Sequence, residues 1–114
     1  MITLNIQNNL VSAAVLGEFT LTDFREFEEQ LRYVLQFNGQ ARLLLDLRDM
    51  VSMTLDVALE ELRFTREHPQ AFDRIAVVAE DTWTQWRALL TNLFVDAEIQ
   101  PFTDSEQAQA WLAA

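Results

Sequence analysis

The sequence predicts a single α/β domain, 1–114, built on a mixed, mostly parallel five-stranded sheet with an N-terminal β-hairpin and four helices. Two nearly continuous apolar runs, RLLLDLR at 42–48 and RIAVVA at 74–79, are typical of central strands that are covered on both faces. Segments with a helical spacing of apolar residues separate these runs from each other and from the remaining strands. This alternation predicts the element order β-β-α-β-α-β-α-β-α.

The N-terminal part of the chain predicts a hairpin followed by a helix. ITLNI at 2–6 alternates apolar and polar residues, the following QNN favours a turn, and LVSAAVLG at 10–17 forms the second strand. Apolar residues then recur with helical spacing from Thr22 to Asn38, and Gly39 is a typical C-terminal stop.

The rest of the chain predicts three more helices and a last strand. After a loop at 49–53, a second helix begins near Leu55 and must end before Pro69. Asp81 caps a third helix, which extends to Phe94. EIQPF at 98–102 is the last strand, and its proline favours a sheet edge. Thr103 and Glu106 have the spacing of a capping box at the start of the final helix.

The composition excludes several kinds of chemistry. The chain contains no cysteine and no lysine, one histidine and two glycines, which removes thiol, Schiff-base and glycine-rich phosphate-loop sites. Eight arginines against eighteen carboxylates give a net charge of −10, which disfavours nucleic acids and anionic membranes as partners. We expect a cytoplasmic protein without membrane insertion, because no segment resembles a signal peptide or a membrane span.

Carboxylates follow the predicted strands, and two interpretations compete for them. They are Glu18, Asp49, Glu80, Asp81 and Asp104. A metal site at this edge of the sheet is one hypothesis. Helix capping is the other, and we favour it because helix N-termini gather at the same edge. We therefore predict no metal and no cofactor.

Two further titratable residues stand out. Asp46 lies inside the apolar run LLLDL, so we expect an arginine partner for its charge. His68 is the only imidazole, but it lies in the last turn of a helix before Pro69, where a cation interacts favourably with the helix dipole. We assign it a structural role and predict no catalytic residue.

The second predicted helix has an unusual outer face. Val57 and Phe64 are seven residues apart and lie opposite the apolar stripe, flanked by Glu60 and Glu61. Isolated exposed apolar residues are common, but an aligned pair on an acidic helix is a candidate dimer or partner surface.

Four segments together resemble the bacterial SpoIIAA-like family, whose members are described as STAS/SEC14-like domains. They are RLLLDLRDM, LEELRF, FDRIAVVAEDTWTQW and EIQPFTDSEQAQAWL, with tryptophans three residues apart and a terminal Ala-Trp-Leu as the best markers. The resemblance spans nearly the whole chain and implies a fold rather than a catalytic activity.

The resemblance implies two different functions. Anti-sigma-factor antagonists of the STAS group bind a partner through the region between their third strand and second helix, where a D-S-S/T-G serine is phosphorylated. Here the corresponding segment runs from Met53 to Val57 and lacks that motif, although Ser52, Thr54 and Asp56 lie nearby. A hydroxyl just ahead of a helix is most often a cap, so we predict no phosphorylation switch.

SEC14-type carriers instead hold a hydrophobic molecule between sheet and helix. Eight phenylalanines and three tryptophans fit such a carrier, with Trp83, Trp86 and Phe94 as candidate ligand contacts, although aromatic residues at helical spacing are usually core. We predict a non-enzymatic, self-associating protein-interaction or regulatory module, and as the alternative a binding protein or sensor for a small hydrophobic ligand.

Overall fold

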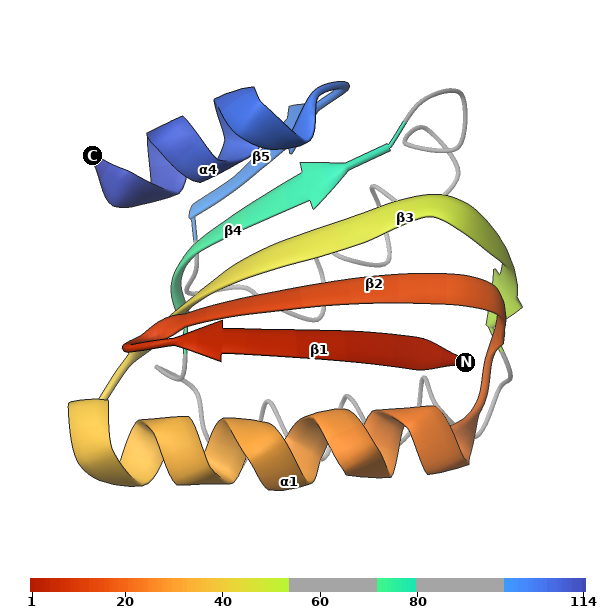
Figure 1. The fold of residues 1–114 in the computed structure, drawn as a ribbon, viewed down its shortest axis with the longest axis horizontal. Helices are drawn as coiled ribbons and strands as arrows, with labels where there is room; N and C mark the ends of the chain where they lie inside the picture. The colour runs from red at the N-terminus through yellow and green to blue at the C-terminus, as the bar shows by residue number, and fades with distance from the viewer. Residues whose placement is uncertain (54–71, 80–97) are drawn as a thin grey trace.

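The computed structural model describes residues 1–53, 72–79 and 98–114 (Figure 1). Within these ranges the strands are β1 (Ile2–Gln7), β2 (Leu10–Phe19), β3 (Ala41–Met53), β4 (Phe72–Val78) and β5 (Glu98–Phe102). The helices are α1 (Leu21–Asn38) and α4 (Ser105–Ala113). The helices predicted between Leu55 and Pro69 and between Asp81 and Phe94 lie outside the described residues.

The five strands form one sheet in the order β1-β2-β3-β4-β5. β1 is antiparallel to β2, and every other neighbouring pair is parallel. The predicted α/β class and mostly parallel five-stranded sheet with an N-terminal hairpin are confirmed. β4 begins two residues earlier than predicted and ends at Val78, whereas β5 has the predicted bounds.

The hairpin turns at Asn8 and Asn9, because Gln7 pairs directly with Leu10. Asn8 adopts a positive φ of 56°, which asparagine tolerates better than most residues and which a tight two-residue hairpin turn requires. The predicted turn at QNN is therefore confirmed, with β1 extended by one residue to Gln7.

Helix α1 has specific signals at both ends. The Thr20 hydroxyl accepts a hydrogen bond from the Asp23 backbone N–H, and the Asp23 carboxylate accepts one from the Thr20 N–H, which makes a capping box. At the other end Gly39 has a φ of +81° and donates its N–H to the Leu35 carbonyl. The predicted stop at Gly39 is confirmed, while the helix begins at Leu21 rather than Thr22.

The predicted loop at 49–53 is wrong, because β3 continues to Met53 and β2 to Phe19. The two strands remain paired across two register shifts, where β3 carries one more residue than β2. Gly17, with a φ of +69°, lies at the second shift. Bulges of this kind interrupt the period-two pattern from which the strand ends were predicted.

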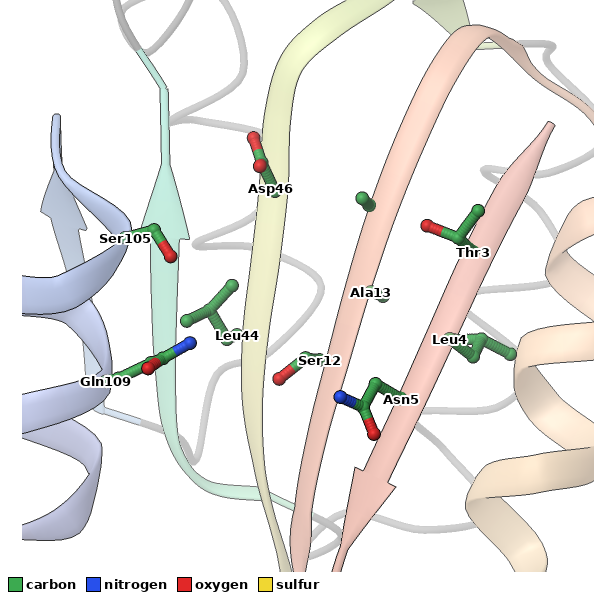
Figure 2. Close-up of a pocket in the computed structure, with 10 residues that line it drawn as sticks. Thr3, Leu4, Asn5, Ser12, Ala13, Leu44, Asp46, Ser105 and Gln109 are labelled. Carbon is green, nitrogen blue, oxygen red and sulfur yellow. The ribbon is translucent and has the colours of Figure 1, made fainter.

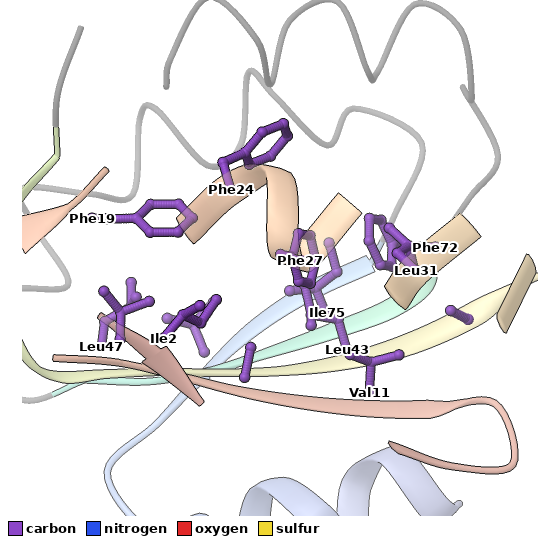
Figure 3. Close-up of a cluster of buried hydrophobic side chains, with 14 of the residues drawn as sticks. Ile2, Val11, Phe19, Phe24, Phe27, Leu31, Leu43, Leu47, Phe72 and Ile75 are labelled. Atoms are coloured by element: carbon purple, nitrogen blue, oxygen red, sulfur yellow. The ribbon is translucent and has the colours of Figure 1, made fainter. Parts of the chain in front are cut away.

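Two hydrophobic layers cover the two faces of the sheet. Helix α1 and the larger cluster, which includes Val11, Leu31, Leu43 and Ile75, lie on one face (Figure 3). Helix α4 packs on the other face, where Ala108 and Leu112 contact a smaller cluster. This placement confirms that the apolar runs of β3 and β4 are covered on both sides.

The N-cap of α4 differs from the prediction. Asp104 occupies that position, and its carboxylate accepts a hydrogen bond from the Glu106 backbone N–H at 2.9 Å. Thr103 lies one residue before this N-cap and is therefore not the capping residue.

Candidate functional site

The carboxyl ends of β2 and β3 stay paired as far as Phe19 and Met53. Glu18 pairs in register with Ser52, and the preceding pair is Gly17 with Met50, which leaves Val51 as the extra residue of the bulge. Val51 is 80% exposed, the most exposed large apolar side chain among the described residues. A bulge reorients a side chain while the ladder on either side holds the backbone. The edge therefore presents a fixed apolar contact to solvent.

Ser52 lies in β3, and the helix that it was predicted to cap lies outside the described residues. Its hydroxyl donates to the Glu18 carboxylate, with 3.4 Å between Oγ and Oε2. The hydroxyl is thus oriented by an acceptor on the neighbouring strand. Thr54 and Asp56, the other members of the predicted switch-equivalent segment, lie outside the described residues.

Asp46 has the arginine partner that the sequence predicts, and the partner is Arg48. Nε and Nη2 of Arg48 donate to the two carboxylate oxygens at 3.0 and 2.8 Å, and the Arg48 backbone N–H donates as well at 3.1 Å. These hydrogen bonds lower the pKa of Asp46, although partial burial acts in the opposite direction. Asp46 therefore stays ionised on the sheet face that also carries α4.

An open groove of about 250 Å³ lies beside this ion pair, between α4 and strands β1 to β3 (Figure 2). Most side chains along it are polar or small: Thr3, Asn5, Ser12, Ala14, Asp46, Ser105 and Gln109. Two large apolar residues also line it, Leu44 beside α4 and Leu4 on β1 (Figure 2). Hydroxyls, amides and a carboxylate suit polar groups of a protein surface better than a hydrocarbon ligand.

The capping role predicted for five carboxylates is confirmed for one of them. Asp104 is the confirmed N-cap of α4. Glu18 and Asp49 lie inside strands, so the capping interpretation is wrong for them, because β2 and β3 extend past the predicted ends. Glu80 and Asp81 lie outside the described residues. Within 1–53, 72–79 and 98–114, no three His, Cys, Asp or Glu side chains are grouped so that they could hold a metal ion.

The remaining predicted site residues also lie outside the described residues. They are Val57, Glu60, Glu61, Phe64, His68, Trp83, Trp86 and Phe94. Their predicted roles stay predictions.

Sequence reasoning missed two exposed apolar features. Val51 was assigned to a loop, and only strand pairing identifies it as a bulge residue. Tyr33 and Phe37 on α1 are 66% and 69% exposed, with ring centroids 5.1 Å apart. The same search for apolar pairs opposite the buried stripe that selected Val57 and Phe64 would have found them.

Neither helix in the described part of the chain has the combined length and hydropathy of a transmembrane segment.

Comparisons with known proteins agree with this fold. A family model described as SpoIIAA-like matches residues 10–113. An uncharacterized protein from Shewanella loihica with a SpoIIAA-like fold superposes with a TM-score of 0.78 at 21% identity, covering 98% of this chain and 92% of that chain. No match was found among curated proteins.

Two regulatory proteins have the same fold. The anti-sigma factor antagonist SpoIIAA in its unphosphorylated form gives a TM-score of 0.66 at 9% identity, covering 100% and 99% of the two chains. An anti-sigma factor antagonist from Mycobacterium paratuberculosis gives 0.60 at 18% identity, covering 100% and 96%. At these identities the structures show a shared fold.

Proposed function

The chain belongs to the SpoIIAA-like family, and from this membership we propose that it is a non-enzymatic cytoplasmic module that regulates another protein by binding it and that also self-associates. The fold is that of anti-sigma factor antagonists, which act through protein contacts. The proposal assigns partner binding to the carboxyl edge of β2 and β3 and to the segment that follows Met53.

The main support for partner binding at this edge is the exposure of Val51, which lies on a bulge between paired residues of β3. An apolar side chain held on a rigid strand loses little conformational entropy when it is buried by a partner. Glu18 and Ser52 lie beside it and can accept and donate hydrogen bonds at the rim of the contact. Thr54 and Asp56 follow directly in sequence and belong to the same proposed surface.

We assign no phosphorylation switch to this edge. The segment from Met53 to Val57 lacks the D-S-S/T-G motif. A phosphate on Ser52 would also carry its charge to within a few ångströms of the Glu18 carboxylate, which already accepts the Ser52 hydroxyl at 3.4 Å.

A second proposed contact surface is the outer face predicted around Val57 and Phe64, with Glu60 and Glu61 at its margin. Composition supports the proposed non-enzymatic role, because a chain with one histidine, no cysteine and no lysine has no thiol or amine nucleophile from a side chain. No metal or cofactor enters the proposal.

The alternative function is the binding of a small hydrophobic ligand by Trp83, Trp86 and Phe94. Native mass spectrometry distinguishes it, because a retained ligand would add a few hundred daltons that disappear on denaturation. The polar groove beside Asp46 plays no part in that alternative.

Photo-cross-linking tests the main proposal. A benzoylphenylalanine placed at Val51 should capture one protein in the source cells, and the same probe at Arg25, which is exposed on α1, should not. Val51→Asp should abolish the capture of that protein by a probe at Ser52 while leaving the circular dichroism spectrum unchanged. Equal capture from Val51 and Arg25, or capture that survives Val51→Asp, would contradict the assignment.

A further inference from the structure

Strand β1 lies at the edge of the sheet, with β2 as its neighbour on one side (Figure 1). The Leu16 N–H donates to the Met1 carbonyl at 2.8 Å, and the Met1 nitrogen donates to the Leu16 carbonyl at 3.1 Å. Because antiparallel neighbours alternate between facing the partner strand and facing away, the N–H and C=O of Ile2, Leu4 and Ile6 point outward. No hydrogen bond between described residues reaches these outward groups.

The two edges of the sheet are protected very differently. β5 carries Glu98 and Pro101, a charge and a residue without an N–H, both of which discourage strand addition. β1 has the sequence ITLNIQ, with neither a charge nor a proline. The edge at β1 is therefore chemically open to another strand.

A groove with both apolar and polar lining runs along this open edge. It has a volume of about 560 Å³ and is lined by Ile2, Thr3, Leu4, Ile6, Glu26 and Gln30. Leu4 and Ile6 are only half-buried and face the α1 side of the sheet. An added strand would complete their burial.

The exposed aromatic pair belongs to the same surface. Glu26, Gln30, Tyr33 and Phe37 follow one another at intervals of four, three and four residues, which places them within an arc of about 60° on α1. The stripe of α1 that borders the groove thus continues into two neighbouring rings, tilted by 56° to each other, that are two-thirds exposed.

We infer that β1 pairs with β1 of a second copy of this chain, antiparallel about a two-fold axis, to form one continuous sheet. In the register with Leu4 opposite Leu4, Ile2 lies opposite Ile6 and all outward N–H and C=O groups are paired. The apolar side chains of both copies then share the α1 face, and Thr3 lies opposite Asn5 on the other face. This inference rests on the self-association part of the proposed function and assigns its surface.

A second copy fits this edge better than a charged partner. The chain carries a net charge of −10, so two copies repel each other over most of their surfaces, whereas β1 is uncharged. Apolar and polar side chains alternate along β1, and in the register with Leu4 opposite Leu4 apolar residues lie opposite apolar ones and polar residues opposite polar ones. Two rings that are 66% and 69% exposed offer roughly 270 Å² per copy, about a third of the roughly 800 Å² that a standard interface buries per partner.

Sedimentation equilibrium tests the inference. Tyr33→Ser/Phe37→Ser should raise the dimer dissociation constant about tenfold or more, whereas Gln107→Ser, at an exposed residue of α4 on the opposite face of the sheet, should leave it unchanged. Raising the salt concentration should lower the dissociation constant, because screening reduces the repulsion between two acidic copies.

Charge pairs on the polar face test the register. Thr3→Glu/Asn5→Glu places like charges opposite each other across the two-fold axis and should dissociate the dimer, whereas Thr3→Glu/Asn5→Arg places opposite charges there and should restore it. A dimer that is insensitive to all these variants would overturn the β1 assignment and leave the proposed self-association intact. A monomer at every concentration would overturn both, and partner capture at Val51 would still test the regulatory function separately.

Discussion

Replacing Thr20 with alanine should destabilise the protein by about 2 kcal/mol. The Thr20 hydroxyl accepts from the Asp23 N–H at 3.3 Å and donates to the Asp23 carboxylate at 2.9 Å. The first bond is long, so we assign it about 0.5–1 kcal/mol, the lower part of the range for N-caps. The second has a charged acceptor that is only 13% exposed, and we assign it about 1–1.5 kcal/mol.

Asp23 gives this prediction a pH dependence. Burial alone raises the pKa of Asp23, but hydrogen bonds from the Thr20 N–H, the terminal ammonium and the Thr20 hydroxyl outweigh it, and the net pKa is lowered. A carboxyl group with a lowered pKa stabilises the folded state above its unfolded pKa of about 3.9, and this contribution is lost as the pH falls through the folded value. The difference between wild type and Thr20→Ala should therefore narrow below about pH 4.

Urea denaturation at pH 7 and pH 3 measures both effects. Thr20→Ser is the matched control, because it keeps the hydroxyl and should cost well under 1 kcal/mol. An equal loss of stability in Thr20→Ser and Thr20→Ala, or a loss in Thr20→Ala that is the same at both pH values, would contradict these assignments.

Three further predictions concern the helix end and the candidate site. Gly39→Ala should cost about 1–2 kcal/mol from backbone strain at a φ of +81°, since nothing lies within 4 Å of an added Cβ, and thermal unfolding should show the loss without a change in fold. Arg48→Ala should raise the pKa of Asp46 measured by NMR titration of its carboxyl carbon, because the hydrogen bonds that lower it are removed, and an unchanged pKa would contradict the assignment. Ser52→Ala should change stability by less than about 0.5 kcal/mol. Ser52→Glu should destabilise the protein, because the new carboxylate faces that of Glu18. Equal midpoints of urea unfolding for the two variants would contradict the contact between Ser52 and Glu18.

The fold was predictable where the signals are local. The buried runs of β3 and β4, the hairpin turn at Asn8 and the helix stop at Gly39 each follow from composition within a few residues. The sequence also predicted that Asp46 has an arginine partner, because a charge within an apolar run requires a partner of opposite charge. The structure identifies this partner as Arg48, two residues away on the same face of the strand.

The site was less predictable because it depends on pairing between distant segments. The extension of β3 to Met53 requires β2 to remain alongside through two register shifts, and these shifts turn a predicted loop into the edge that exposes Val51. Nothing in the residues 49–53 alone shows this, since a bulge breaks the alternation by which strands are recognised.

By itself the sequence determined the fold class, the order of most elements and the chemistry that the protein lacks, because hydrophobic periodicity, turn residues and composition act locally or are absolute. Only the tertiary structure decided which edge of the sheet is open, which side chains share the stripe of α1 beside it, and where Ser52 and Glu18 meet. These properties are set by strand register and packing between residues far apart in the chain. A shift of register by one residue would move every side chain of a strand to the opposite face.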